Sequence, residues 1–300
     1  MKRNPTKIPL LPLLSSYAYL REEPAARELA MSRPDVELLL DCGAFTALNA
    51  GKEIALKDYI AFLHEHKANL FGYIALDKLQ DPVTTELNLK IMLSEGLKPI
   101  PVHVLGDTER RMDELFEYSD WVAFGGLRRP HRGPAPTSYV KQKMTWAKGR
   151  KAHWLGYTQK RMLETFRPYS CDCSSWAAGG MYGRVLCYLG NGEWITMSYA
   201  QLRKNKLHDN PKVRRALDYY EIEVRDLLDP AHWHNGNAGA ELPAAQCVLM
   251  KLPARSFVRY VLEFRRKFGT RFFIACHGKQ VDLLLNAYDL VKRKGLGPEN

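Results

Sequence analysis

Short apolar runs alternate along the chain with longer segments whose apolar residues recur at helical spacing. The clearest run, Val36 to Leu40, has Glu37 as its only polar residue, and such runs are typical of strands buried on both faces of a parallel sheet. Between residues 56 and 68 the apolar side chains recur at helical spacing, which predicts an amphipathic helix. The repeated pair of strand and helix predicts an α/β fold.

The pattern yields eight strands, and strand-helix units repeated to this number predict a (β/α)₈ TIM barrel. The predicted strands are residues 11–20, 36–41, 71–77, 99–105, 121–124, 153–157, 169–172 and 271–276. The predicted helices between and after them are residues 24–31, 56–68, 81–96, 107–118, 138–148, 159–166 and 281–294. Because no repeat, low-complexity tract or linker divides the chain, we expect residues 1–300 to form a single domain.

The alternation breaks after the seventh predicted strand. Residues 185–197 predict a hairpin around Asn191-Gly192, because Asn-Gly adopts the positive φ angles that tight hairpin turns need. A charged helical segment over 198–228, a loop over 232–243 and a basic amphipathic helix over 253–268 follow. We therefore predict a helical, basic insertion at about 184–268, between the seventh and eighth strands.

Three of the predicted strands end in or near an aspartate: Asp41, Asp77 and Asp172. A single aspartate after a strand is most simply a cap for the next helix. In a barrel, however, the carboxyl ends of all strands converge on one mouth, so three aspartates favour a shared site. Two carboxylates that face a sugar carbon can divide the roles of nucleophile and general acid/base.

Other residues at the predicted strand ends complete the candidate pocket. They are His103, Gly125, Gly126, Leu127, Tyr157 and His277. The glycine pair would allow a flat ligand to approach the backbone and would offer N–H donors, although a tight turn alone also explains it. Each histidine is a candidate ligand or base, but a hydrogen-bonded structural histidine is the commoner case.

Metal chemistry is a competing use of the same aspartates and histidines. No pair in the sequence has the close ligand spacing of a zinc or two-metal motif, so we predict neither a metal nor another cofactor. A metal-dependent nuclease or hydrolase that uses Asp41, Asp77, His103 and His277 stays an alternative. A non-catalytic nucleic-acid-binding barrel, whose aspartates are structural caps, is another.

The charge of the chain adds a prediction about its partner. Lys and Arg outnumber Asp and Glu by 44 to 33, a formal charge of +11, and basic groups among aromatics suit a phosphate backbone with unstacked bases. The clearest clusters contain Arg128 and Arg129, Arg214 and Arg215, and Arg265 and Arg266. For any single cluster, solvated helix faces and core tryptophans are the better explanation, so the prediction of nucleic-acid binding depends on the set.

The remaining composition places the protein in the cytoplasm. The apolar runs are too short to cross a membrane, and the first residues lack the long apolar core of a signal peptide. The six cysteines are scattered without a pairing framework, which predicts reduced thiols. We expect a globular protein with no membrane partner.

Four segments resemble motifs of the tRNA-guanine transglycosylase superfamily. Asp41-Cys42-Gly43-Ala44-Phe45 is similar to its Asp-Ser-Gly-Gly-Phe motif, and Ala123-Phe124-Gly125-Gly126-Leu127 is similar to its Gly-Gly-Leu segment. Asp77 and Asp172 stand where that family keeps its base-reading aspartate and its nucleophile. The resemblance covers about residues 36–184. It implies that Asp172 attacks C1′, that Asp41 is the general acid/base, and that Asp77, His103, the glycine pair, Leu127 and Tyr157 bind the base.

The departures from the family indicate one branch of it. The tRNA enzymes carry a Cys-x-Cys-x-x-Cys plus His zinc site after the nucleophile, and this chain lacks that spacing. Its length and its basic insertion resemble the branch in phages and bacterial genomic islands that inserts 7-deazaguanines into DNA. The resemblance implies exchange of guanine for 7-cyano-7-deazaguanine in DNA of a bacterial or phage-infected cell, with accessory modification proteins as further candidate partners; exchange in tRNA is the alternative.

Overall fold

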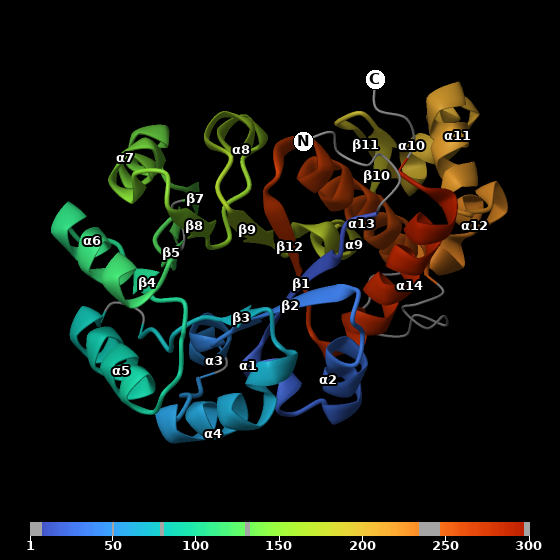
Figure 1. Cartoon of the computed structure of the whole chain (residues 1–300). Coiled ribbons are helices and arrows are strands. Elements are labelled where there is room, and N and C mark those ends of the chain that lie inside the picture. Colours follow the sequence, from blue (N-terminus) through green and yellow to red (C-terminus); the bar gives the residue numbers. More distant parts are fainter. Residues whose placement is uncertain (1–7, 50, 79–80, 130–132, 234–246, 297–300) are drawn as a thin grey trace. The chain divides into compact units, whose positions relative to one another are not determined.

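A computed structural model describes residues 8–49, 51–78, 81–129, 133–233 and 247–296 (Figure 1). The chain forms two compact units. The first, which we call the sheet unit, comprises residues 12–173 and 268–279, and the second, the helical unit, comprises residues 1–11, 174–267 and 280–300.

The sheet unit is built on eight parallel strands. In chain order they are β1 (Leu11–Ser16), β2 (Val36–Asp41), β3 (Gly72–Tyr73), β4 (Val102–His103), β5 (Trp121–Phe124), β8 (Lys151–Trp154), β9 (Ser170–Cys173) and β12 (Arg271–Ala275). Their order in the sheet is β3-β2-β1-β12-β9-β8-β5-β4, so strands that follow one another in the chain are neighbours. This mixed α/β architecture is compatible with a TIM-like fold.

The two ends of this curled sheet meet at one point. Ile74, directly after β3, pairs in parallel with Ile100, which precedes β4. The amide of Ile100 donates to the Tyr73 carbonyl at 2.8 Å, and the amide of Ala75 donates to the Ile100 carbonyl at 2.9 Å. The regular strands are short here because Pro99 and Pro101 flank Ile100 and proline has no N–H to donate to a ladder.

The inner face of the sheet carries a hydrophobic cluster with a polar layer beside it. The cluster consists of Leu14, Leu39, Ile74, Ile100, Val102, Trp121, Ala123 and Phe273. Asp41 lies two residues after Leu39 on β2, so strand alternation places both side chains on the same face. Asp172 is the parallel partner of Phe273 and therefore also shares the inner face. Two of the predicted site aspartates, Asp41 and Asp172, therefore lie on the same face of the sheet as the hydrophobic cluster.

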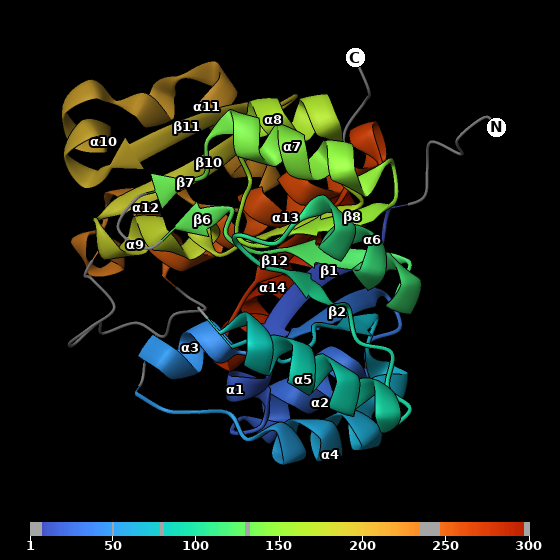
Figure 2. The same cartoon turned by 90° about the vertical axis from the view of Figure 1, so that its left-hand side faces the viewer.

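Helices pack along the outer side of the sheet (Figures 1 and 2). They are α1 (Tyr17–Leu20), α2 (Pro24–Met31), α3 (Ala44–Asn49), α4 (Leu56–His66), η1 (Lys67–Asn69), α5 (Pro82–Ser94), α6 (Glu109–Tyr118), α7 (Thr137–Ala147) and α8 (Lys160–Phe166). A short two-stranded pair, β6 (Arg128–Arg129) and β7 (Gly133–Pro134), follows β5. Local sequence sets the helix starts: Asp81 caps α5 by accepting from the Thr84 amide, and Thr108 caps α6 by accepting from the Arg111 amide.

The helical unit contains the predicted hairpin and nearly all of the helical segments predicted over residues 198–228 and 253–268. Its elements are η2 (Ser175–Ala177), α9 (Ala178–Met181), β10 (Arg184–Gly190), β11 (Glu193–Ser198), α10 (Tyr199–Asn205), η3 (Leu207–Asp209), α11 (Pro211–Tyr219), α12 (Val224–Leu228), η4 (Pro230–Trp233) and most of α13 (Val248–Phe268) and α14 (Gly278–Lys294). The strands β10 and β11 are antiparallel and joined by Asn191-Gly192, both with positive φ, which confirms the predicted turn. The single-domain assignment with an insertion at 184–268 stays a prediction, and residues 234–246 within it lie outside the described residues.

The prediction of one strand over residues 11–20 is wrong in its second half. The strand β1 ends at Ser16, and Tyr17 begins the helix α1. The ring of Tyr17 packs against the rings of Tyr59 and Phe62 in α4, with centroids 5.2 and 5.1 Å away. An unbroken apolar run fits a buried strand and a buried helix equally well, and the aromatic packing decides between them.

In the part of the chain that the structure describes, no helix combines the length and the apolar character needed to cross a bilayer. All six cysteines are among the described residues; they are buried and form no disulfide there.

Candidate active site

The first site carboxylate stands at the carboxyl end of β2. Asp41 is the last residue of the strand, and one of its oxygens, Oδ2, accepts a hydrogen bond from the Gly43 amide at 2.9 Å. Gly43 has a φ of +84°, and a Cβ there would lie 3.1 Å from the Cβ of Ala18, so only glycine fits this turn without strain. The sequence Asp-Cys-Gly therefore fixes the direction of the Asp41 side chain.

Asp41, Asp77 and Asp172 form one electrostatic cluster. Burial, together with the negative charges of Asp77 and Asp172, raises the pKa of Asp41 to about 7, and hydrogen bonds from the Gly43 and Cys42 amides oppose this rise. Geometry agrees with this coupling: β2 and β3 pair in parallel, and Cys42, next to Asp41, donates to Asp77 Oδ1 at 3.2 Å. Asp172 shares the inner face of the sheet with Asp41, because its partner Phe273 belongs to the same core cluster as Leu39. The structure thus brings together the three aspartates that the sequence predicted to converge.

Asp77 follows β3 and is held by its own turn and by the thiol of Cys42. Cys42 Sγ donates to Asp77 Oδ1 at 3.2 Å, and burial raises the pKa of this thiol well above its usual value, so it stays protonated and able to donate. Asn88 of α5 anchors the preceding residue by donating to the Leu76 carbonyl at 3.0 Å. Burial raises the pKa of Asp77, partly offset by the Cys42 hydrogen bond. A ligand with N–H donors would relieve this desolvated carboxylate.

Asp172 lies within β9 and is the most enclosed of the three aspartates. Its side chain is 13% exposed, and its Oδ1 accepts a hydrogen bond from the Gly156 amide at 2.8 Å. Nε2 of His153, on the neighbouring strand β8, lies 3.3 Å from the same oxygen. Cys171 and Cys173 alternate with Asp172 along the strand, so their thiols face away from the site.

His103, a predicted base-binding residue, lies in a different environment. Its side chain is fully buried, Nε2 lies 3.0 Å from the Thr108 carbonyl, and Nδ1 lies 2.6 Å from Nζ of Lys143 in α7. Both ring nitrogens are therefore occupied in this conformation. Burial lowers the pKa of His103 to about 4, helped by the charge of Lys143, and burial lowers the pKa of Lys143 to about 7. This pair joins β4 to α7 on the outer face of the sheet.

The glycine pair and its neighbours are partly used by the fold itself. The Gly125 amide donates to the His103 carbonyl at 3.0 Å, so it is not the free donor that the sequence suggested. Gly126 has a φ of +71°, and a Cβ there would lie 2.8 Å from the Leu105 Cβ, which requires glycine. Leu127 is fully buried. A contact of these residues with a base stays a prediction.

Tyr157 packs against the outer layer of the sheet unit. Its ring meets Trp154 edge-on at 5.6 Å, and its hydroxyl donates to Gln159 Oε1 at 3.0 Å. Trp154 in turn contacts Phe166 of α8. His277 was a candidate metal ligand in the alternative of a metal-dependent nuclease. The centroid of its ring lies 5.9 Å from that of Tyr19. Within the described parts of the chain, no group of three or more His, Cys, Asp or Glu side chains is arranged to hold a metal ion.

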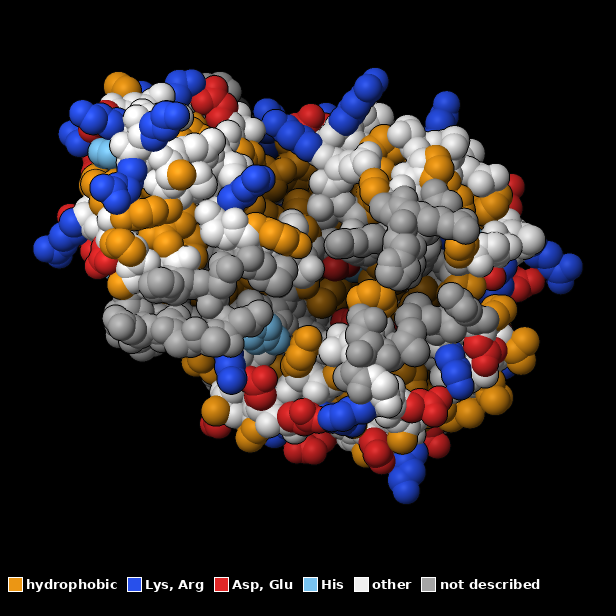
Figure 3. Space-filling model, turned by 180° about the vertical axis from the view of Figure 1, so that it is seen from behind, with side chains coloured by type: hydrophobic (Ala, Val, Ile, Leu, Met, Phe, Trp, Pro, Cys, Tyr) orange, Lys and Arg blue, Asp and Glu red, His pale blue; other side chains and the backbone are white. Residues whose placement is uncertain are grey.

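The predicted basic clusters differ in exposure. Arg214 and Arg215 are exposed on α11, and Arg214 pairs with Asp209 at 3.6 Å. Arg265 and Arg266 are half-buried, and the guanidinium of Arg265 donates to the Leu10 carbonyl at 3.1 Å. The backbone of Arg128 and Arg129 forms β6, and Pro130, His131 and Arg132 lie outside the described residues. Figure 3 shows Lys and Arg side chains projecting from one face with acidic groups between them.

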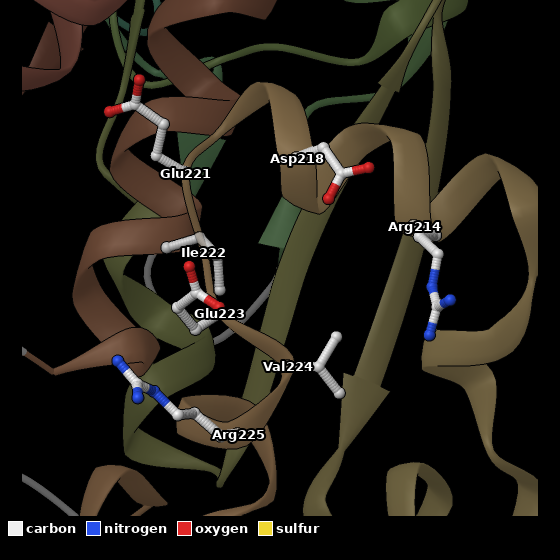
Figure 4. A pocket seen from close by; sticks show the side chains of 7 residues that line it. All are labelled: Arg214, Asp218, Glu221, Ile222, Glu223, Val224 and Arg225. Atoms are coloured by element: carbon white, nitrogen blue, oxygen red, sulfur yellow. The ribbon is translucent and has the colours of Figure 1, made fainter.

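An open groove of about 490 Å³ lies beside α11 and α12 in the helical unit (Figure 4). Its lining consists of Arg214, Asp218, Glu221, Ile222, Glu223, Val224 and Arg225. Three carboxylates and two guanidinium groups line it, so the groove does not present one sign of charge. None of the predicted catalytic residues belongs to it.

Sequence reasoning missed three contributors to the site: Cys42, His153 and Gly156. Cys42 was visible only as a departure from the Asp-Ser-Gly-Gly-Phe motif. His153 and Gly156 stood in a predicted strand whose inward face was unknown; the parallel pairing of His153 with Ser170 supplies that information. Comparison of the sequence with protein-family models and with curated proteins finds no match.

Proposed function

We propose that this protein is a nucleic-acid guanine transglycosylase, a pentosyltransferase that exchanges guanine in DNA for a 7-deazaguanine base such as 7-cyano-7-deazaguanine. The observation that carries the proposal is the cluster of Asp41, Asp77 and Asp172, because base exchange needs a nucleophile, a general acid/base and a group that reads the base. The motifs that resemble the tRNA-guanine transglycosylase superfamily contain these three residues.

The proposed reaction has two balanced halves. Asp172 attacks C1′ of the target nucleoside and forms an ester, while the C1′–N9 bond breaks and its electron pair leaves with guanine. Asp41 gives its proton to the departing guanine. The 7-deazaguanine base then returns a proton to Asp41, attacks C1′ and releases Asp172. A pKa of about 7 for Asp41 suits both proton transfers, since both protonation states are populated near neutral pH.

The proposal includes a closed (β/α)₈ barrel with a basic insertion at about 184–268. The order of the eight strands and the parallel bridge between Ile74 and Ile100 support closure. The exposed cations of α10, of its C-terminal cap Lys206 and of α11 support binding to a polyanion; they are Arg203, Lys204, Lys206, Lys212, Arg214 and Arg215. We call these six residues the basic surface.

Uptake of labelled base distinguishes the proposed function from its alternatives. The protein is incubated with labelled guanine and either duplex DNA or tRNA, with and without a chelator. We expect label in DNA and no effect of the chelator. Label in tRNA alone would make RNA the substrate. Chelator-sensitive strand cleavage without label would indicate a nuclease, and binding without either reaction would indicate a non-catalytic protein.

The Asp77→Asn variant should lose base selectivity more than affinity for the polymer. The Asp77 carboxylate offers acceptors for N1–H and the exocyclic amine of guanine, whereas an amide presents one donor in their place. A buried polar mismatch of this kind should lower the preference for guanine over adenine by about 10- to 100-fold. Competition between the two bases measures the preference, and a salt titration of DNA binding serves as the control. Equal losses in both would contradict the assignment.

Neutralising Arg214 and Arg215 to glutamine should make DNA binding less sensitive to salt. Each phosphate contact contributes a slope of about −0.9 to the dependence of log K on log salt, so two contacts account for about 1.8. The matched control replaces the half-buried Arg265 and Arg266, which should change the slope less because Arg265 already contacts the Leu10 carbonyl. A larger effect from the control pair would place the nucleic acid elsewhere.

A further inference from the structure

His153 carries a buried nitrogen whose hydrogen-bonding capacity is unused. Its side chain is fully buried, and Nε2 forms no hydrogen bond, although it lies 3.3 Å from Asp172 Oδ1. Buried polar atoms without a partner are rare and costly in native proteins. An unpaired buried nitrogen of this kind indicates a functional role. The carboxylate oxygen that lies 3.3 Å from it belongs to Asp172, the proposed nucleophile.

The surroundings of His153 hold its ring in one orientation. The ring lies edge-on to Trp121 and to Phe273, each with its centroid 6.1 Å away. Its other nitrogen, Nδ1, lies 2.8 Å from Ser170 Oγ, and Ser170 is the parallel partner of His153 across the β8–β9 pair. Two aromatic rings and one hydroxyl thus aim Nε2 toward Asp172.

The contacts of the two ring nitrogens together favour one tautomer. When the Ser170 hydroxyl donates to Nδ1, the ring proton is on Nε2 and faces the carboxylate oxygen. The opposite tautomer would place a nitrogen lone pair against an oxygen lone pair, which is repulsive. The arrangement with the proton on Nε2 satisfies both contacts.

The two oxygens of Asp172 have unequal environments as a result. Oδ1 accepts from the Gly156 amide at 2.8 Å and faces His153 Nε2. Oδ2 accepts no hydrogen bond from any residue that the structure describes, and the side chain retains 13% exposure. A carboxylate that is held by one oxygen can attack with the other without first breaking a hydrogen bond.

We propose that His153 is a positioning residue that, together with the Gly156 amide, holds Oδ1 of Asp172 and leaves Oδ2 to attack C1′. The contact shortens to a hydrogen bond when the site is occupied, as contacts that are long in an empty site commonly do. This inference rests on the proposed function, in which Asp172 is the nucleophile. It adds a residue that has no role in the motifs described above.

Two amide variants of His153 separate its two contacts. Glutamine places its Nε2 near the position of the histidine Nε2 and keeps a donor toward Asp172. Asparagine places its amide near the position of Nδ1 and keeps only the contact with Ser170. Both are neutral, so they differ in reach and not in charge. The measurement is the single-turnover rate of covalent adduct formation on guanine-containing DNA, together with the apparent affinity for DNA and the melting temperature.

We expect His153→Asn to slow adduct formation by about 10- to 100-fold with unchanged DNA affinity, the change that corresponds to loss of a hydrogen bond to a charged group. His153→Gln should recover most of that loss at a similar melting temperature. Equal adduct rates in the two variants would overturn the inference.

Two further variants keep the result unambiguous. If neither His153 variant folds, Ser170→Ala decides the question: loss of the hydroxyl frees the tautomer and should slow adduct formation, and an unchanged rate would overturn the inference. Asp172→Asn tests the proposed function separately. Adduct formation by Asp172→Asn would refute the nucleophile itself, whereas a silent Asp172→Asn with a fully active His153→Asn would refute only the role of His153.

Discussion

The Asp172→Asn variant is expected to form no covalent adduct and to lose base exchange by a factor on the order of 10⁴ or more, because an amide lacks the charge that attacks C1′. The substitution is nearly isosteric. The asparagine carbonyl can still accept from the Gly156 amide, which donates to Oδ1 at 2.8 Å in the native protein. The measurement is trapping of the adduct with guanine-containing DNA in a denaturing gel, alongside uptake of labelled guanine.

Folding and DNA binding supply the controls for this result. Asp172→Asn should keep the native circular dichroism spectrum and the native salt dependence of DNA binding, because the basic surface belongs to the helical unit and Asp172 to the sheet unit. A native adduct yield from this variant would transfer the role of nucleophile to another residue. Asp41 would then be the next candidate, since its carboxyl belongs to the same cluster.

The sequence predicted the aspartates of the site better than their neighbours, for a physical reason. The apolar run before Asp41 is buried on both faces, so its end marks the rim of the sheet whichever way the strand is turned. His103 also ends a strand, but Val102 faces the core, and alternation therefore turns His103 outward. In a run that is apolar on both faces, sequence periodicity does not identify which residues face inward.

The same ambiguity concealed His153. The predicted strand over 153–157 offered His153 and Trp154 as adjacent residues on opposite faces. Only the pairing of His153 with Ser170 across the β8–β9 pair turns His153 inward and Trp154 outward. Strand pairing is a long-range property of the fold, and it decides which polar residues meet Asp172. The two-residue turn Asn191-Gly192, by contrast, is a local property, and the sequence predicted it correctly.

The Asp41→Asn variant is expected to slow base exchange while making the protein more stable at alkaline pH. Loss of a general acid/base lowers rates by about 10²- to 10⁴-fold. An asparagine can still accept from the Gly43 amide, which donates to Asp41 Oδ2 at 2.9 Å. Covalent attack by Asp172 is a separate step, so a slowly formed adduct should remain detectable.

The gain in stability follows from the raised pKa of Asp41. Burial and the charges of Asp77 and Asp172 raise that pKa from 3.8 to about 7, so the folded protein binds this proton more tightly than the unfolded chain does. The free energy of unfolding therefore falls as pH rises from about 4 to about 7. In this pH range the folded protein still holds the proton on Asp41, whereas the unfolded chain has lost it. Each pKa unit corresponds to about 1.4 kcal/mol, which sets an upper limit of about 4 kcal/mol on the loss above pH 7; solvent contact of the half-buried carboxyl reduces it.

Melting curves of the native protein and of Asp41→Asn at pH 4 and pH 8 measure this effect. The neutral amide has no charge to bury, so the two proteins should differ little at pH 4, and the variant should melt at the higher temperature at pH 8. A variant that is less stable than the native protein at pH 8 would mean that the ionised carboxylate is stabilised by its surroundings. Asp41 would then be a structural cap for the turn at Gly43, and the general acid/base would have to be found elsewhere in the cluster.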